Sequence, residues 1–265
     1  MSVYGLKRLT RTLFLQGLFA LLLTLPALVW AQEAPYKVSE HYSKFEAYIP
    51  MRDGVRLYTV VFVPKARSEK PYPIMLMRTC YSVPYGANNY PARLGPSRQL
   101  MESGCIFAMQ DVRGKFMSEG EWVEIRPLQK KYTRKQDIAE TTDTYDTVDW
   151  LVKSVPNNNG RVGMWGISYP GFYAAMGAIN AHPAVVAVSP QAPVSEWFMG
   201  DDPHRNGAFM LLDVFFFYGG TGRVRPRPSM GMAGVPLDTK GYTDSYRFFL
   251  DMGALPNIDK KQYKG

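Results

Sequence analysis

The stretch MWGISYPGFYAAMG, residues 164–177, decides the fold because it places one serine where a strand turns into a helix. The apolar residues 162–167 predict the strand, and the good helix formers after Pro170 predict the helix. Ser168 lies between Gly166 and Gly171, and a turn this tight needs glycines beside it, because neighbouring Cβ atoms would collide with strand or helix. The pattern predicts a nucleophile elbow, in which the serine hydroxyl stands clear of the sheet.

The rest of the chain predicts an α/β fold with a mostly parallel sheet that begins with an antiparallel hairpin. Residues 45–64 alternate in polarity on both sides of Asp53-Gly54, a pair typical of hairpin turns. Short apolar runs then alternate with helical stretches, the pattern of parallel strands joined by crossovers. The runs are 73–77, 105–109, 162–167 and a buried strand at 184–193, and the helical stretches are 98–103, 142–154 and 169–183.

The spacing after Ser168 departs from G-x-S-x-G, because Pro170 takes the place of the second glycine and the stretch reads G-x-S-Y-P-G. This variant resembles the elbow of the family of cocaine esterase, α-amino-acid ester hydrolases, glutaryl acylases and Xaa-Pro dipeptidyl peptidases. Four further stretches resemble the same family in the same order: MRDGVRLYTVVFVP at 51–64, MLMRTCY at 75–81, MQDVRGKFMSEGEW at 109–122 and WFMGDD at 197–202. The resemblance covers residues 40 to 220.

The resemblance implies a serine hydrolase on an α/β-hydrolase fold, in which Ser168 attacks an ester or amide carbonyl to form an acyl-enzyme. The oxyanion that develops needs two hydrogen-bond donors. By analogy with the family these are the backbone N–H of Tyr169 and the hydroxyl of Tyr81. Without the resemblance, Tyr81 reads as a packed tyrosine at the edge of a loop.

Asp202 matches the second aspartate of a similar G-D-D stretch in α-amino-acid ester hydrolases, which binds the α-ammonium group of the substrate. The match is partial, because the chain continues with Pro203-His204-Arg205 where relatives have aromatic residues and a histidine. Arg205 could pair with Asp202 and cancel the site, so a structural salt bridge or a helix cap is the alternative role.

The chain holds three histidines, and none of them fits the triad order of serine, then acid, then histidine. His41 precedes the sheet, His182 ends the helix that Ser168 starts, and His204 comes before any further strand. Relatives of the family are longer, so we expect either a fragment of a larger enzyme or a degenerate product that lacks the catalytic Asp and His. The expected domains are the N-terminal part of the hydrolase domain at 32–193 and the truncated start of a helical cap at 194–265, with helices at 208–218 and 242–253.

Residues 1–31 have the pattern of a signal peptide: Lys7, Arg8 and Arg11 precede an apolar run, and a cleavage site follows at Ala31. The alternative is an uncleaved membrane anchor, for which the run is marginally long. We therefore expect export to the periplasm or the outside of the cell, with no membrane span after cleavage. The segment carries three of the 31 basic residues and no acidic one, which changes the net charge from +8 to +5. The densest basic cluster, KKYTRK at 130–135, reads as a solvated loop rather than a nucleic-acid patch.

An exported chain with two cysteines invites a disulfide, but Cys80 follows the run 73–77 and Cys105 opens the run 105–109. In parallel strands the two thiols then lie at opposite ends, about 17 Å apart, so we expect both to be free and largely buried. We expect no cofactor, no metal and no nucleic acid, but an ester, amide or short-peptide substrate. An unprotected sheet edge at 185–189 predicts dimerisation or aggregation of the chain. The competing functions are an Xaa-Pro dipeptidyl peptidase and a noncatalytic exported binding module.

Overall fold

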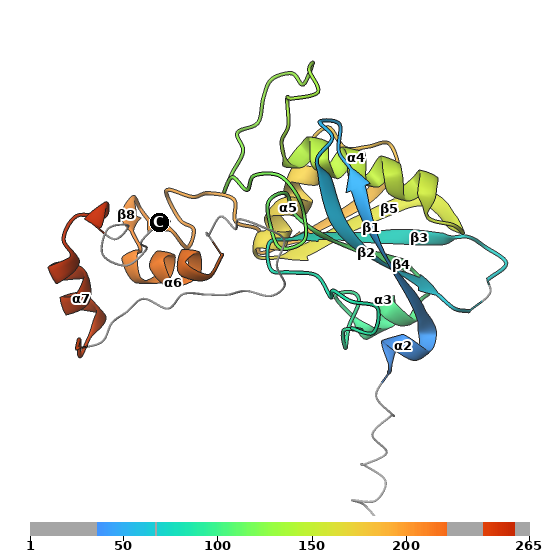
Figure 1. Ribbon diagram of the computed structural model, residues 1–265, viewed down its shortest axis with the longest axis horizontal. Coiled ribbons are helices and arrows are strands. Elements are labelled where there is room, and N and C mark those ends of the chain that lie inside the picture. The colour runs from blue at the N-terminus through green and yellow to red at the C-terminus, as the bar shows by residue number, and fades with distance from the viewer. Residues whose placement is uncertain (1–35, 67, 222–240, 258–265) are drawn as a thin grey trace, which may run out of the picture. The chain divides into compact units, whose positions relative to one another are not determined.

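A six-stranded mixed sheet is the centre of the fold (Figure 1), and the strands lie in the order β1-β2-β4-β3-β5-β6. The computed structural model describes residues 36–66, 68–221 and 241–257, so the predicted signal peptide lies outside the described residues. All the elements belong to the unit that begins at Val38. They are α2 (Val38–His41), β1 (Tyr42–Pro50), β2 (Arg56–Pro64), β3 (Tyr72–Thr79), α3 (Arg98–Glu102), β4 (Ile106–Asp111), α4 (Glu140–Ser154), β5 (Asn158–Ile167), α5 (Tyr169–Ala178), β6 (Val185–Gln191), β7 (His204–Arg205), β8 (Ala208–Phe209), α6 (Leu211–Thr221) and α7 (Ser245–Met252).

The N-terminal hairpin forms as predicted. Strands β1 and β2 pair antiparallel along their whole length, from Tyr42 opposite Pro64 to Pro50 opposite Arg56. Gly54 in the turn has φ +90°, a conformation that glycine adopts without steric cost. Strand β2 then pairs antiparallel with β4, which joins the hairpin to the rest of the sheet.

The remaining pairs are parallel, as the alternation of strands and helices predicted. Strand β3 lies between β4 and β5, and β6 lies beside β5. Helices α4 and α5 cover one face of the sheet and α3 lies on the other (Figure 1). The carboxyl ends of β3, β4 and β5 therefore share one end of the sheet, where open α/β sheets bind their ligands.

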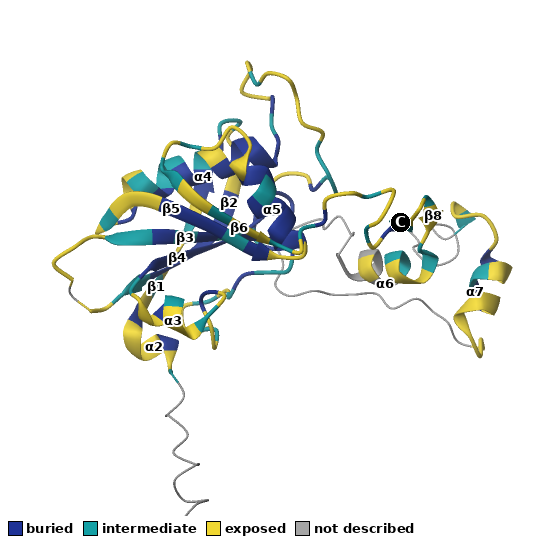
Figure 2. Ribbon diagram, turned by 180° about the vertical axis from the view of Figure 1, so that it is seen from behind, coloured by how far each residue is buried: buried dark blue, intermediate teal, exposed yellow. Residues whose placement is uncertain are grey.

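The main core lies between the sheet and α4, and the central strands are its most buried part (Figure 2). A second cluster lies under the carboxyl end of the sheet and packs α5 against the loops that follow β3 and β4; its buried members are Cys80, Val112, Trp122, Tyr169, Phe172, Tyr173, Met176 and Val194. This cluster fixes the start of α5, where the predicted nucleophile stands.

Three expectations about the later elements need correction. The strand predicted as buried, β6, is half-buried to exposed along its length, because it is the edge strand and only β5 pairs with it in the described sheet. Helix α5 ends at Ala178 rather than continuing to residue 183, since Asn180 has φ +52°. The helix predicted from residue 208 begins at Leu211, because Ala208–Phe209 pairs with His204–Arg205 as a short hairpin.

The cysteine prediction is confirmed. Cys80 and Cys105 are both free and buried, and they lie at opposite ends of the parallel pair β3 and β4, in which Ile74 is opposite Ile106. Burial raises the pKa of the Cys80 thiol to about 12, so this thiol stays protonated and is a poor nucleophile at neutral pH.

No helix within the described ranges is long and apolar enough to cross a membrane.

Candidate active site

Ser168 occupies a strained backbone conformation between β5 and α5. Its φ is +63° and its ψ is −123°, a combination that costs a non-glycine residue stability. The backbone N–H of Ser168 donates to the carbonyl oxygen of Gln191 (3.0 Å), and its carbonyl oxygen accepts from the N–H of Phe172 (3.0 Å). The end of β6 and the first turn of α5 thus hold the serine in this conformation, and its side chain remains exposed.

The two flanking glycines are required by close backbone contacts. A Cβ atom at Gly166 would lie 2.1 Å from the carbonyl oxygen of Pro170, and one at Gly171 would lie 2.6 Å from that of Gln191. Neither distance is possible for a real side chain, and both contacts are with backbone that cannot move independently. The glycine pattern that singled out Ser168 in the sequence has this steric origin.

Tyr81 reaches the serine from the loop after β3. Its hydroxyl lies close enough to the Ser168 side chain for the two to interact, and burial raises the pKa of Tyr81 to about 12. The phenol therefore keeps its proton at neutral pH and can donate a hydrogen bond. Asp111 at the end of β4 holds this loop, because its carboxylate accepts from the N–H groups of Val83 (3.0 Å) and Met117 (3.2 Å).

Tyr169 begins α5, so its backbone N–H belongs to the first helical turn, where N–H groups point beyond the helix end and favour negative charge. Its side chain is buried, and its hydroxyl donates to Glu124, to the carbonyl oxygen at 2.9 Å and the carboxylate Oε1 at 2.5 Å. The ring of Tyr169 stacks against Phe217, with the ring centres 6.2 Å apart. Nothing in the sequence signals the contact with Glu124, because Glu124 lies in a polar loop 45 residues away.

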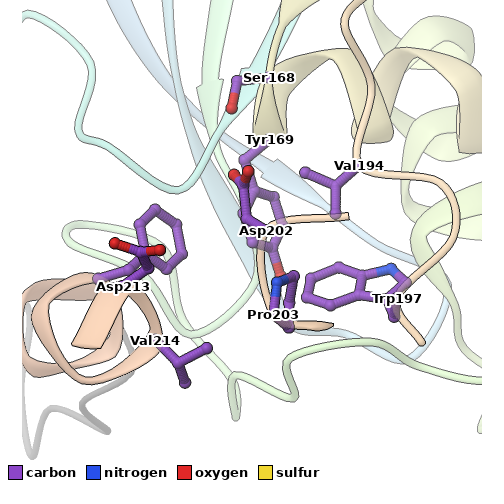
Figure 3. Close-up of a pocket in the computed structure, with 9 residues that line it drawn as sticks. Ser168, Tyr169, Val194, Trp197, Asp202, Pro203, Asp213 and Val214 are labelled. Carbon is purple, nitrogen blue, oxygen red and sulfur yellow. The ribbon is translucent and has the colours of Figure 1, made fainter. Parts of the chain in front are cut away.

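A cavity of about 520 Å³ opens in front of Ser168 (Figure 3). The oxygens of Ser168 and Asp202 both project toward this space, and Asp213 approaches it from α6. The cavity is thus lined mostly by apolar and aromatic side chains, with two carboxylates and one hydroxyl among them. The lining residues are Ser168, Tyr169, Val194, Trp197, Asp202, Pro203, Asp213, Val214 and Phe217.

Of the two carboxylates that line the cavity, the sequence analysis predicted Asp202 but not Asp213. Asp202 is exposed, and no ion pair joins it to Arg205 within the part of the chain that the structure describes. Asp213 was not among the expected site residues. Its only sequence signal is that it is the single charge in the apolar run 208–218, because its approach to the cavity depends on where α6 lies. Together they give the cavity a negative side that suits a cationic group.

None of the three histidines lines this cavity. His204 shares a 2.7 Å hydrogen bond between its Nδ1 and the carbonyl oxygen of Trp197, and its ring packs against Phe198 and Phe209. The Nε2 atom of His182 lies 3.4 Å from Asp149, and His41 ends α2. Among the described residues, the predicted nucleophile Ser168 therefore lines the cavity without a histidine beside it.

Buried ion pairs hold the strand ends from which the site loops start. Arg78, near the end of β3, donates to the Glu140 carboxylate at 2.9 Å. Arg113, just after β4, donates to Asp143 at 2.7 and 2.9 Å and to Asp53 in the hairpin turn at 2.7 Å. The partners of Arg78 lie on β4 and α4, and those of Arg113 lie on α4 and in the hairpin turn. The loops that follow β3 and β4 therefore start from fixed points.

This arrangement is suited to acyl transfer. It combines an exposed serine at a helix N-terminus, a protonated phenol beside it and a lined cavity. No group of three or more metal-binding side chains gathers anywhere in the described ranges.

Comparison with known proteins agrees with this geometry. A model of the family described as X-Pro dipeptidyl-peptidase (S15 family) matches residues 53–229. Cocaine esterase from Rhodococcus sp. is 29% identical over 142 residues, which are 54% of this chain and 22% of that protein. The chain thus spans less than a quarter of that curated relative.

Two solved structures share the fold. An α-amino acid ester hydrolase labelled with selenomethionine superposes with a TM-score of 0.66 at 35% identity, and the match covers 87% of this chain and 37% of that one. An aminopeptidase from a marine sediment Thaumarchaeota archaeon gives a TM-score of 0.69 at 32% identity, with 86% and 37% covered. These matches confirm the predicted α/β-hydrolase fold.

Proposed function

Because the chain belongs to the X-Pro dipeptidyl-peptidase (S15) family of serine hydrolases, we propose that it cleaves ester or amide bonds of α-amino acyl substrates through Ser168. One observation carries the proposal: Ser168 is exposed and strained, it interacts with the hydroxyl of Tyr81, and it lines a cavity together with the carboxylates of Asp202 and Asp213. The relatives act as esterases and an aminopeptidase by their names, so both kinds of bond fall within the proposal.

In the proposed reaction, Oγ of Ser168 attacks the carbonyl carbon, the alcohol or amine leaves, and water then hydrolyses the acyl-enzyme. The oxyanion of each tetrahedral intermediate accepts hydrogen bonds from the N–H of Tyr169 and the hydroxyl of Tyr81. The positive end of α5 adds to this stabilisation. The serine also needs a base to take its proton, and the histidine that usually does so is not among the residues that line the cavity.

Asp202 is the proposed partner of the substrate's α-ammonium group. Its carboxylate projects into the cavity beside Ser168 (Figure 3), and a carboxylate can pair with a cation that neutral donors cannot hold. Asp213 on α6 adds a second negative charge to the same cavity. A substrate with a free amino group should therefore bind better than its N-acetylated form.

The matched family is described as X-Pro dipeptidyl-peptidase, which favours peptide substrates with proline as the second candidate. The apolar wall that includes Val194, Trp197 and Phe217 would then hold the proline ring. Hydrolysis of an amino-acid ester and of a Gly-Pro anilide separates the two substrate classes. The noncatalytic binding module remains the third candidate, and it predicts that Ser168→Ala leaves ligand binding unchanged.

The first experiment is covalent labelling of the chain by a fluorophosphonate, read as intact mass. We expect one adduct on the wild-type chain and none on Ser168→Ala, because the strained serine at the helix N-terminus is the reactive hydroxyl. Tyr81→Phe should slow labelling by about 10²-fold, the typical effect of losing one oxyanion donor. If the chain stays unlabelled while circular dichroism shows it folded, Ser168 has no base in this chain, and the proposal that the chain cleaves esters or amides by itself is overturned.

A competition arm tests the amino-group preference. An amino-acid ester should protect Ser168 from the probe at lower concentration than its N-acetyl form, and Asp202→Asn should abolish that difference. Equal protection by both esters would contradict ammonium binding while leaving the nucleophile assignment intact.

We also propose that the protein is exported, on the basis of residues 1–31, and that it acts on small esters, amides or short peptides rather than on nucleic acid. Fractionation of cells that express the full chain tests the export, since the cleaved form should appear outside the cytoplasm. The exposed edge strand β6 also supports self-association, which the mass in solution measures.

A further inference from the structure

Glu124 contacts Tyr169 from the loop after β4, two residues beyond the stretch 109–122 that resembles the family. The hydroxyl of Tyr169 lies 2.5 Å from Oε1 of Glu124 and 2.9 Å from its carbonyl oxygen. The shorter distance is typical of a hydroxyl that donates to a charged carboxylate, and such hydrogen bonds are about twice as strong as neutral ones. The carboxylate is therefore the stronger of the two partners of this hydroxyl.

The segment that carries Glu124 is itself packed. Trp122 and Ile125 belong to the cluster under the carboxyl end of the sheet, Trp122 as a buried member and Ile125 as a partly buried one. The Nζ atom of Lys115 lies 3.4 Å from the centre of a Trp122 ring, and Glu124 is half-buried. The carboxylate thus reaches Tyr169 from a segment that its neighbours fix, rather than as a solvated side chain.

Tyr169 lies next to the proposed reacting atom. It follows Ser168 directly, it is the first residue of α5, and it lines the cavity. Its backbone N–H is also the proposed oxyanion donor. Because a reacting group misplaced by about 1 Å can cost about 10²-fold in rate, the position of Tyr169 matters for any acyl transfer at Ser168.

Aromatic packing alone does not select one position for the Tyr169 ring. Aromatic pairs are favourable at several angles, with ring centres about 4.5–7 Å apart. The contacts of Tyr169 show this range, with interplanar angles of 86° to Phe172, 35° to Tyr173 and 8° to Phe217. A hydrogen bond is directional, so the contact with Glu124 selects one position among those that the packing allows.

We infer that Glu124 is a positioning residue for the reaction at Ser168: its carboxylate fixes the Tyr169 hydroxyl and thereby keeps the Tyr169 N–H where the oxyanion forms. This inference rests on the proposed function. Glu124 is not among the residues that line the cavity, so it acts through Tyr169 and not on the substrate. It also influences the second proposed donor, because burial raises the pKa of Tyr81 to about 12 and the charge of Glu124 adds to this effect.

The rate at which a fluorophosphonate labels the full chain tests the inference. Glu124→Ala should slow labelling by about tenfold, because a displaced donor loses part of its effect on the oxyanion. Glu124→Gln should recover most of the rate, since its amide oxygen still accepts a hydrogen bond. Tyr169→Phe removes the same hydrogen bond but keeps the backbone N–H, and it should also slow labelling by about tenfold. The double variant should be no slower than either single variant, because both changes remove one interaction.

Glu121→Ala is the matched control, because Glu121 is an exposed glutamate of the same loop. Thermal melts show that each variant is folded at the temperature of labelling. A hydrogen bond that only stabilises the fold would lower the thermal midpoint of Glu124→Ala and leave its labelling rate unchanged.

That result would overturn the inference, as would an equal loss in Glu121→Ala, no recovery in Glu124→Gln, or losses that multiply in the double variant. In each of these cases the wild-type chain is labelled, so the assignment of Ser168 as nucleophile stands. A wild-type chain that is folded but unlabelled overturns the proposed function, and this inference with it.

Discussion

Replacing Ser168 by glycine should stabilise the protein while removing the proposed nucleophile. At φ +63° and ψ −123° the Cβ atom strains the backbone by about 1–3 kcal/mol. Glycine removes that strain, but it loses about 0.4–1 kcal/mol relative to alanine through the greater freedom of the unfolded chain. Ser168→Gly should therefore be about 1–2 kcal/mol more stable than Ser168→Ala, and both lack the hydroxyl.

Ser43 provides the matched control, because it is an exposed serine in the regular strand β1. There the comparison should have the opposite sign, with Ser43→Gly about 0.5–1 kcal/mol less stable than Ser43→Ala. Urea unfolding followed by circular dichroism measures all four variants. The thermal midpoint of Ser168→Gly should lie about 2–8 °C above that of Ser168→Ala. If glycine at position 168 is the less stable of the pair, the serine is not strained and the reasoning about the elbow is wrong.

Three further outcomes follow from packing and charge. Arg113→Met should cost about 3–5 kcal/mol, because it leaves buried carboxylates without their cation, whereas Arg98→Met should leave the urea midpoint nearly unchanged because both partners of its ion pair with Glu102 are solvent-exposed. Gly166→Ala should destabilise the chain by about 3 kcal/mol and abolish fluorophosphonate labelling, since its Cβ would overlap the carbonyl of Pro170. Partial burial raises the pKa of Asp53, but the hydrogen bond and charge of Arg113 outweigh it and the pKa is lowered. This contribution is present above about pH 4 and is lost as the pH falls through the lowered pKa, so Asp53→Asn should flatten the loss of stability on acidification, measured as urea midpoints at several pH values.

The sequence predicts the sheet well because its signals are local. Polarity alternation and the Asp53-Gly54 pair predict the hairpin, and the apolar runs predict β3, β4 and β5. The sequence also predicts the nucleophile elbow, because its two glycines are required by backbone contacts close by. A Cβ at Gly166 would collide with Pro170, and one at Gly171 would collide with Gln191 at the end of β6. The placement of Tyr81 beside the serine came from family resemblance, because it depends on parallel pairing between strands distant in the chain.

The missed features depend on tertiary placement. The sheet edge predicted at 185–189 is confirmed by β6, but the burial predicted from its apolar run is wrong, because an edge strand in this position leaves its side chains half-buried to exposed. Asp213 reaches the cavity only through the position of α6, and Glu124 meets Tyr169 only after a polar loop folds back over α5.

The parallel register of β3 and β5 has a consequence for the order of events in folding. Leu76 pairs with Met164 across the middle of the sheet, and all of β4 and α4 lie between these residues in the chain. Contacts between such distant segments form slowly, because a long loop must close first. Tyr81 and Ser168 therefore meet only when this central pairing is complete. During refolding, the rate at which Ser168 becomes reactive toward the probe should equal the rate at which β3 and β5 pair. The hairpin of β1 and β2 joins neighbouring segments, so we expect it to form earlier.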